Sequence, residues 1–483
     1  MNTARKAAKN AGILFFSQLM TYPLGFLYIV YTARYLGTEE FGVLSFALAF
    51  AAIFKILVDM GFDGLGVREI ARDRELAGKY LGNVIPVKIV LGISCFALIV
   101  LSVKLLGYPE ETARAVYLVS AGVLFTSFTE MFNAIFRAFE RMGPISVGLV
   151  TNKVTLLSLT LLAISMGLGL EAISAIYLVA SGLAFAYALF TCTRKYVLPA
   201  IEIDRVFLKE TLKKSLPFFL SAAVNIIAFK IDMVMLSMLK GDAAVGYYSA
   251  AYRLIEALHV VPVSLAGSLY PVFSTFHVSS KEALNSAYEI SFKLLLIAGL
   301  PIAIGTTLLA DRIVPLMYGS EFAPSIPALK ILIWTIPPIF LSYIIGTLFS
   351  SINRQVLSLK INTFTTALNI VANLLLIPGY GFLGAAFATV LTYTTSFTLG
   401  FYFTSRLTCK IPLTGFALKL LAANVGMALF VLSLPGANLI LLIAGSAAVY
   451  LGVLNVFGVV SKKDYEMLFR REDEMQGPSM DAV

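Results

Sequence analysis

Long apolar runs dominate the chain and are separated only by short polar breaks. Between Gly12 and Val460 these runs reach about 20 residues or more, enough for a helix to cross a hydrocarbon core of roughly 30 Å. The runs are continuous rather than strictly alternating, which favours helices over the strands of a membrane barrel. The pattern predicts about fourteen transmembrane helices, over residues 9–35, 40–62, 82–106, 113–138, 144–168, 171–196, 216–239, 245–275, 284–310, 326–351, 355–378, 382–407, 412–434 and 437–460.

A sequence repeat relates the two halves of this pattern. The segment 37–47 recurs 204 positions later as 241–251, with the glycine, glycine, serine and alanine positions kept. A shorter echo relates 167–169 to 379–381, ahead of the sixth and twelfth helices. Because six helices in each half is an even number, both halves begin on the same side of the membrane, which gives a parallel repeat.

The repeat and the helix count together predict the domain organisation. We expect an all-α integral membrane protein with two six-helix bundles related by a pseudo-twofold axis, followed by two C-terminal helices. The expected divisions are 1–200, 201–410, 411–460 for the additional helices and 461–483 for a cytoplasmic tail.

Composition and charge agree with a membrane protein. Apolar residues make up 59% of the chain, charged residues 13%, and the mean hydropathy is +0.86, whereas soluble domains carry about 25% charged residues. Lys and Arg number about 23 in the predicted inner segments against about six in the outer ones. This bias predicts a multi-pass protein of the cell membrane (inner or plasma) with both termini cytoplasmic, and it accounts for the net charge of +9 without a nucleic-acid partner.

The sequence lacks motifs for disulfide frameworks, metal sites and dinucleotide binding. The three cysteines, Cys95, Cys192 and Cys409, are far apart, and only two histidines occur, so neither a disulfide framework nor a metal site is expected. The glycine spacing of 379–384 matches a dinucleotide fingerprint, but it follows a membrane helix rather than a strand. We expect no enzyme activity and no cofactor, with Na⁺ or H⁺ coupling as the possible ionic requirement.

Charged side chains deep in the predicted spans are the candidate functional residues, because each costs several kcal/mol unless it faces a cavity or a partner. They occur as four groups in four helices and one cation near the outer end of the first helix. The groups are Lys55 with Asp59, Glu130 with Asn133 and Arg137, Lys230 with Asp232, and Arg253 with Glu256, and the separate cation is Arg34.

Cations along a cavity attract a polyanion such as a pyrophosphate, which Arg binds in bidentate fashion. The candidates for substrate binding are therefore Arg34, Lys55, Arg137, Lys230 and Arg253. The candidates for ion coupling are Asp59, Glu130, Asp232 and Glu256. Structural ion pairs that join helices are the alternative for each pair. Other lysines in the spans, Lys88 among them, are expected to snorkel toward the cytoplasmic ends.

Several motifs resemble those of polysaccharide flippases. The run 34–42, followed by Asp59-Met-Gly-Phe, is similar to their start, and further matches lie at 245–253, 318–325 and 378–386. Their order and spacing resemble the Wzx-type branch of the multidrug/oligosaccharidyl-lipid/polysaccharide exporter superfamily. Arg34 and Arg253 lie within matching motifs, whereas Lys55, Arg137 and the Lys230–Asp232 group do not.

The resemblance implies two six-helix bundles plus two helices, a cationic central cavity and ion-coupled alternating access. The implied activity is flipping of an undecaprenyl- or dolichyl-phosphate-linked oligosaccharide from the cytoplasmic to the outer leaflet. Its partners would be this lipid-linked oligosaccharide, membrane lipids and glycan assembly enzymes. One alternative is a drug or cation antiporter of the same superfamily, which should need an acidic residue in the first helix, where residues 10–34 have none. The other is a non-transporting assembly protein.

Overall fold

The computed structural model describes residues 3–199, 203–407 and 414–458. Within these ranges the chain is helical and contains no strand. The predicted tail, 461–483, and Cys409 lie outside the described residues.

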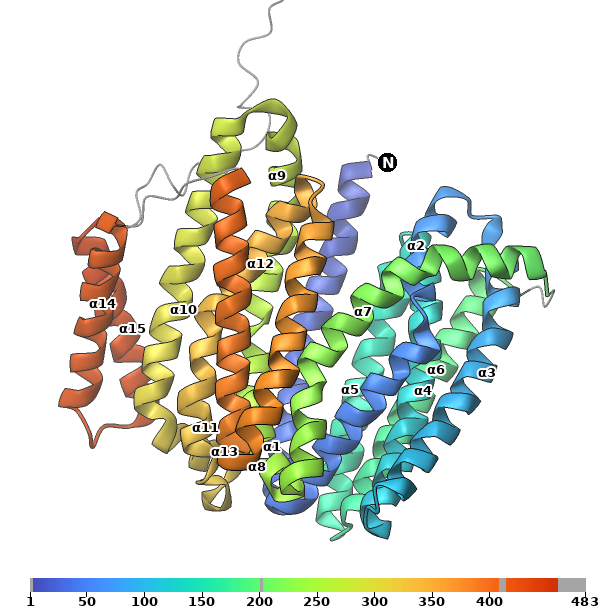
Figure 1. Cartoon of the computed structure of the whole chain (residues 1–483), viewed down its shortest axis with the longest axis horizontal. Coiled ribbons are helices and arrows are strands. Elements are labelled where there is room, and N and C mark those ends of the chain that lie inside the picture. Colours follow the sequence, from blue (N-terminus) through green and yellow to red (C-terminus); the bar gives the residue numbers. More distant parts are fainter. Residues whose placement is uncertain (1–2, 200–202, 408–413, 459–483) are drawn as a thin grey trace, which may run out of the picture. The chain divides into compact units, whose positions relative to one another are not determined.

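The helices follow one another through short turns (Figure 1). Their bounds are α1 Thr3–Asp59, α2 Phe62–Arg72, α3 Leu76–Leu105, α4 Glu110–Ala138, α5 Met142–Ser165, α6 Leu170–Lys195, α7 Arg205–Lys240, α8 Asp242–Leu258, α9 Val260–Ser279, α10 Lys281–Tyr318, α11 Ser325–Leu332, α12 Ile336–Ser351, α13 Gln355–Leu407, α14 Thr414–Ser433 and α15 Leu439–Val456, with short 3₁₀ turns at Ser320–Phe322 and Ile333–Thr335.

The number of membrane helices agrees with the sequence pattern. Twelve segments of the described chain are long and apolar enough to cross a membrane. Two of them are each interrupted by a glycine with positive φ, Gly37 in α1 and Gly381 in α13. Counting each interrupted segment as two helices gives the fourteen that the sequence predicts, so the expected all-α membrane fold is confirmed.

The repeated glycines mark a close crossing of two helices. Gly37 and Gly241, which are equivalent in the repeat, both have a left-handed backbone, with φ values of 70° and 81°. Five residues after each of them, a Cβ on Gly42 would overlap the carbonyl of Asp242, and a Cβ on Gly246 would overlap that of Thr38. Each repeat therefore uses one glycine to turn the chain and one to let α1 and α8 approach each other.

Two compact units make up the chain. The first holds α1 to α7 and the start of α8, up to Ala250, together with the segments 317–324 and 366–385. The second holds the remaining segments, including α14 and α15. In the second unit the two C-terminal helices pack on α10, where the Tyr450 hydroxyl donates a hydrogen bond to the Ile297 carbonyl at 2.7 Å. The predicted domain boundaries remain predictions.

The first unit has its apolar core where α2 meets α3, α4 and α6. Phe62 and Ile70 on one face of α2 are fully buried beside Phe136 of α4, while Arg68 on the same helix is half-exposed. The short helix α2 is thus amphipathic, with one face in the core and the other at the surface. The next helix begins at Leu76, six residues before the predicted start, because Tyr80 and its neighbours pack into this core.

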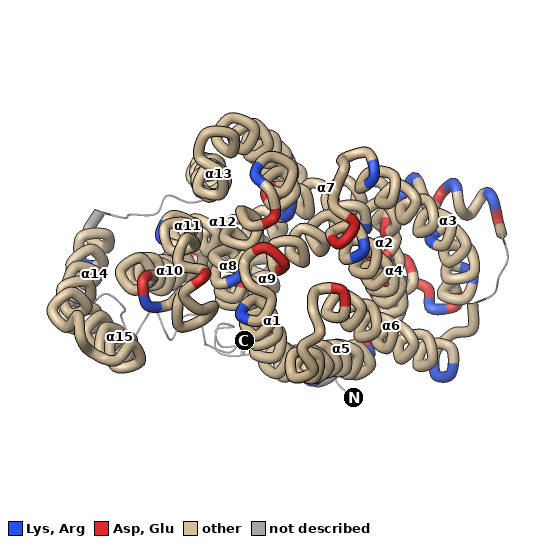
Figure 2. The backbone as a smooth tube through the Cα atoms, turned by 90° about the horizontal axis from the view of Figure 1, so that it is seen from below, with Lys and Arg blue, Asp and Glu red and all other residues tan. Residues whose placement is uncertain are grey.

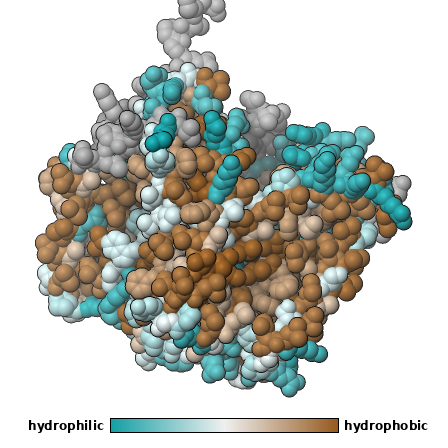
Figure 3. Space-filling view, in the orientation of Figure 1, coloured by the Kyte–Doolittle hydropathy of each residue, from teal (hydrophilic) through white to brown (hydrophobic). Residues whose placement is uncertain are grey.

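The surface separates into apolar and polar zones along the helices of the first unit. Figure 3 shows hydrophobic residues across the middle of this face and hydrophilic residues gathered where α2, α3 and the start of α7 lie. Large apolar side chains on the outer faces of the helices are exposed, as on Ile93 of α3, which is 67% exposed. A lipid environment accommodates such a surface, so the chain is a multi-pass membrane protein.

Candidate functional site

A tight turn between α1 and α2 creates the site. Asp59 is the last residue of α1, and Met60 and Gly61 then adopt left-handed backbones, with φ values of 43° and 73°. A Cβ on Gly61 would collide with the backbone of α7 at Ser215, so only glycine fits. The turn places the carboxylates of Asp59 and Asp63 on the same side, facing α3.

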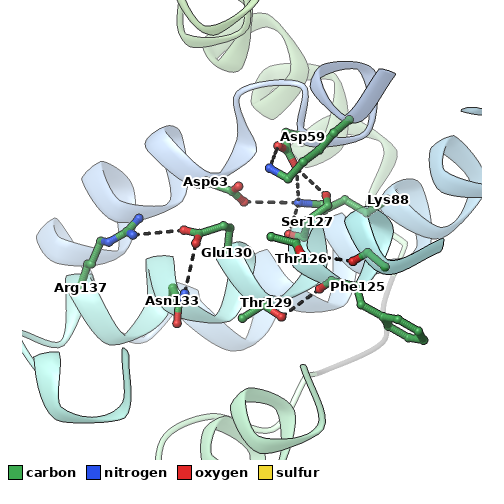
Figure 4. Close-up of polar contacts among 12 residues, drawn as sticks. Asp59, Asp63, Lys88, Phe125, Thr126, Ser127, Thr129, Glu130, Asn133 and Arg137 are labelled. Atoms are coloured by element: carbon green, nitrogen blue, oxygen red, sulfur yellow. Dashed lines mark hydrogen bonds and ion pairs between the residues drawn. The ribbon is translucent and has the colours of Figure 1, made fainter. Parts of the chain in front are cut away.

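Lys88 of α3 lies between these two carboxylates (Figure 4). Its side chain has 0% exposure, and its Nζ lies 3.2 Å from Asp59 Oδ1 and 3.4 Å from Asp63 Oδ1. It also donates a hydrogen bond to the Ser127 carbonyl of α4 at 2.9 Å, so three acceptors match its three N–H donors. The expectation that Lys88 snorkels is wrong, because three helices and a turn enclose its ammonium group.

Lys55 shares the Asp59 carboxylate with Lys88. Four residues apart on α1, the Lys55 ammonium group donates to Asp59 Oδ2, and the Ser127 hydroxyl donates to Oδ1. The side chains of Lys55 and Asp59 are 22% and 20% exposed, in contrast to Lys88. Lys55 is therefore the cation of this group that a ligand can reach.

A polar stripe on α4 extends the site. The Arg137 guanidinium lies 3.1 Å from Glu130 Oε2, and the Asn133 amide donates to Glu130 Oε1 at 3.4 Å. Arg137 is 42% exposed and Glu130 32%. Residues spaced by three, four and seven share one face of a helix, so the stripe predicted from the sequence is present.

We call Lys55, Asp59, Asp63, Lys88, Glu130 and Arg137 the α1–α4 charge network. Its formal charges, three cations and three carboxylates, balance. Figure 2 shows acidic and basic positions together where α2, α3 and α4 meet. Burial raises the pKa of the Asp63 carboxyl to about 6, against the opposing effect of the Lys88 charge. The positive and negative charges of the network therefore balance, and Asp63 is the carboxylate whose ionised form burial disfavours.

A second buried carboxylate lies in the Asp232 cluster, formed by Asp232 of α7, Tyr248 of α8, and Asn369 and Asn373 of α13. Asp232 is 3% exposed, and it accepts hydrogen bonds from Tyr248 Oη at 2.7 Å and from the Asn373 amide at 2.6 Å. The same amide nitrogen donates to Asn369 Oδ1 at 3.0 Å, and Asn373 Oδ1 is buried with no hydrogen-bond partner among the described residues. One hydroxyl group and one amide nitrogen thus hold the buried carboxylate.

The remaining candidate residues are Arg253, Glu256, Lys230 and Arg34. Arg253 forms an ion pair with Glu256 at 2.7 Å in the second unit, with 16% and 25% of the side chains exposed, which favours the structural alternative for this pair. Lys230 is half-buried on α7, two residues before Asp232. Arg34 donates a hydrogen bond from Nε to the Met317 carbonyl at 2.7 Å, so it holds the segment 317–324 against α1.

Sequence reasoning missed Asp63, Lys88 and Ser127. Two of them carried a spacing signal: Asp63 follows Asp59 by four residues, and Ser127 precedes Glu130 by three. Lys88 had no such signal, since only the folded turn brings the carboxylates to it. Among the described residues, no group of three or more His, Cys, Asp or Glu is arranged to hold a metal ion.

The family model described as "Polysaccharide biosynthesis protein" matches residues 7–277, and the MatE model matches 217–375. Among curated proteins, a probable low-salt glycan biosynthesis flippase of Haloferax volcanii is 23% identical over 395 residues, which covers 81% of each chain. A putative O-antigen transporter of Shigella dysenteriae is 24% identical, covering 66% of this chain and 79% of that protein.

Solved structures share the fold. The lipid II flippase MurJ in an inward closed conformation matches with a TM-score of 0.76 and 17% identity, covering 95% of this chain and 99% of that one. An inward-facing multidrug resistance MATE transporter of the MOP superfamily matches with a TM-score of 0.67 and 18% identity, covering 80% and 94%.

Because the first family model covers more than half of the 483 residues, the chain belongs to the polysaccharide biosynthesis protein family. The resemblance to the multidrug/oligosaccharidyl-lipid/polysaccharide exporter superfamily is confirmed.

Proposed function

We propose that the chain flips a lipid-(pyro)phosphate-linked oligosaccharide from the cytoplasmic to the outer leaflet by alternating access. The observation that carries this proposal is the α1–α4 charge network. Two of its cations, Lys55 and Arg137, are partly exposed within a membrane bundle. The names of the relatives, a glycan flippase and an O-antigen transporter, support the same substrate class.

The network suits an anionic headgroup for an electrostatic reason. Lys55 and Arg137 are each paired with a carboxylate, so the empty site contains no uncompensated charge. A phosphate can replace the carboxylate as their partner, and Arg offers a planar fork that matches two phosphate oxygens. The glycan itself needs no charge recognition, so the headgroup is the part of the substrate that this site would hold.

We propose that the Asp232 cluster binds the coupling ion, either Na⁺ or H⁺. The Asp232 carboxylate is a hard oxygen ligand of the kind that small cations prefer. Within the described residues, Asn373 Oδ1, on the amide whose nitrogen donates to Asp232, has no hydrogen-bond partner. A proton on Asp232 would serve equally well in a proton-coupled cycle. Transport driven in proteoliposomes by a Na⁺ gradient alone, or by a proton gradient alone, separates the two ions.

We also propose that both termini are cytoplasmic, that the membrane is the cell membrane, and that the chain performs no enzymatic step. The Lys and Arg bias supports this orientation. Membrane lipids surround the protein, and glycan assembly enzymes are its proposed protein partners. Labelling of single cysteines at Lys104 and at Arg354 with an impermeant maleimide on intact cells tests the orientation. Labelling at position 104 only is the expected result.

The decisive experiment is flipping of a lipid-linked oligosaccharide in proteoliposomes and in a flippase-deficient strain. Lys55→Ala and Arg137→Ala should each reduce flipping, whereas the matched control Lys360→Ala, at an exposed lysine of α13, should not. Parent-like flipping by the Lys55→Ala/Arg137→Ala double variant would exclude the network as the headgroup site.

The alternative function is drug or cation antiport within the same superfamily. The MatE match over 217–375 and the MATE solved structures favour it. Efflux of a cationic dye that depends on Asp232, with no flipping of lipid-linked glycan, would support antiport. The absence of any acidic residue between positions 10 and 34 weighs against this alternative.

A further inference from the structure

Lys88 differs from the other two cations of the α1–α4 charge network. Lys55 and Arg137 are partly exposed, whereas Lys88 has no exposed side-chain surface. Its three donors already have three acceptors, two carboxylates and one carbonyl. Lys88 is therefore placed to act on the carboxylates of the network but not on a ligand.

Lys55 and Lys88 contact different oxygen atoms of Asp59, so the two lysines can have different functions. Lys55 donates to Oδ2, while Lys88 and the Ser127 hydroxyl lie at Oδ1. If Lys55 turns to a phosphate group, Asp59 keeps one cation and one hydroxyl donor. Asp63 also keeps Lys88, so neither carboxylate is left buried without a countercharge.

We propose that Lys88 is the positioning residue that keeps Asp59 and Asp63 ionised while Lys55 leaves its carboxylate to bind the phosphate of the substrate. This inference rests on the proposed headgroup site. The buried Lys88 thus keeps the two carboxylates charged, while the partly exposed Lys55 exchanges the carboxylate for the phosphate.

Several charged groups of the described residues surround Lys88. Asp59 of α1 and Asp63 of α2 contact Lys88 directly, and Lys55 of α1 and Glu130 of α4 interact with these two carboxylates. The centroid of the Phe128 ring lies 6.0 Å from Lys88 Nζ. No neutral side chain can replace the charge of Lys88. Without that charge, Asp63 must take up a proton, or Lys55 must stay with the carboxylates and be lost to the ligand.

The first test measures thermal stability against pH in the purified protein without substrate. Lys88→Met should lower Tm at pH 7.5 and regain it by pH 5.5. An uncompensated carboxylate has a raised pKa in the folded state, so stability rises as pH falls through that pKa. Lys88→Arg should retain the parent profile, and Lys88→Met/Asp63→Asn should regain the Tm at pH 7.5, because the double variant removes the orphaned anion.

The second test measures binding of farnesyl pyrophosphate, a soluble probe with the same headgroup chemistry, to the protein in nanodiscs. Lys88→Met should weaken binding by about tenfold or more at pH 7.5, with recovery at pH 5.5 or with Asp63→Asn. Lys293→Met is the matched control, since Lys293 is also an intramembrane lysine paired with a glutamate, Glu289, and it should leave the affinity unchanged.

The outcomes separate the two proposals. Parent-like Tm and probe-binding profiles in Lys88→Met overturn the role of Lys88. Failure of Lys88→Met/Asp63→Asn to recover stability at any pH also overturns it, because Lys88 would then act only through packing. If the parent binds no probe, or if Lys55→Ala leaves binding unchanged, the headgroup site fails, and the pH dependence of Tm still decides whether Lys88 keeps the carboxylates ionised.

Discussion

The α1–α4 charge network and the Asp232 cluster belong to opposite halves of a duplicated sequence, yet their chemistry differs. The network joins three cations to three carboxylates, and its outer side chains are about one-fifth exposed or more. The cluster surrounds one carboxylate, 3% exposed, with a tyrosine and two asparagines. Each includes residues of a helix that contains or adjoins a repeated glycine turn, at Gly37 in α1 and at Gly241 between α7 and α8.

The difference arises because the duplication preserved the backbone and not the polar residues. At the offset of 204, Lys55 corresponds to His259 and Asp232 corresponds to Tyr28. In our proposal, one half provides ion pairs that a multiply charged ligand can replace, and the other half provides a buried carboxylate that binds one cation. The two proposed ligands therefore correspond to the two kinds of polar group.

Removing both partly exposed cations of the network, Lys55 and Arg137, is expected to reduce flipping more than any other change. Lys55→Ala/Arg137→Ala leaves the carboxylates of Asp59 and Glu130 facing the ligand, so repulsion adds to the lost attraction. We expect flipping of lipid-linked oligosaccharide to fall by about a hundredfold or more in proteoliposomes. Removal of a cation elsewhere should not reduce flipping in this way, and a comparable loss in Lys360→Ala would mean that the effect is not specific to the network.

Asp232→Asn should separate the two regions functionally. The substitution keeps the shape of the side chain and removes its charge, so the gradient-driven flipping rate should fall by about tenfold. Binding of farnesyl pyrophosphate should stay within about twofold of the parent, because the network is unchanged. An equal loss of probe binding in Asp232→Asn and Lys55→Ala would contradict the division into a headgroup site and an ion site.

Sequence reasoning found the elements of this comparison more readily than their contacts. Fourteen helices and the repeat follow from apolar runs and from matched glycines, because a bilayer requires both length and hydrophobicity of each span. The stripe from Glu130 to Arg137 also follows, since it lies within one helix. The position of Lys88 could not be predicted, because its burial depends on the turn at Gly61. That turn brings the carboxylates of α1 and α2 to the lysine of α3.

The repeated glycines offer a more modest test, of the shared backbone rather than of the different sites. Gly42→Ala and Gly246→Ala should each destabilise the protein by about 1–3 kcal/mol, because the added methyl group meets a carbonyl of the opposing helix in both cases. Thermal unfolding in detergent provides the measurement. Gly169→Ala is the control, since a Cβ there has no neighbour within 4 Å. A loss in only one of the two repeat positions would contradict the reciprocal crossing.

The smallest expected effect concerns the start of the second half, where Asp204 caps α7 by accepting hydrogen bonds from Val206 N and Phe207 N. The hydrogen bond from Lys79 at 2.7 Å, ahead of these backbone bonds, lowers the pKa of Asp204 below its usual value. Its stabilising effect is therefore complete at neutral pH and is lost as pH falls through the lowered pKa. Asp204→Asn keeps a capping side chain but loses the ion pair, so its Tm should lie slightly below that of the parent at pH 7 and converge with it in acid. A Tm difference that stays constant down to pH 3 would show that Lys79 contributes nothing, and that the junction depends on the cap alone.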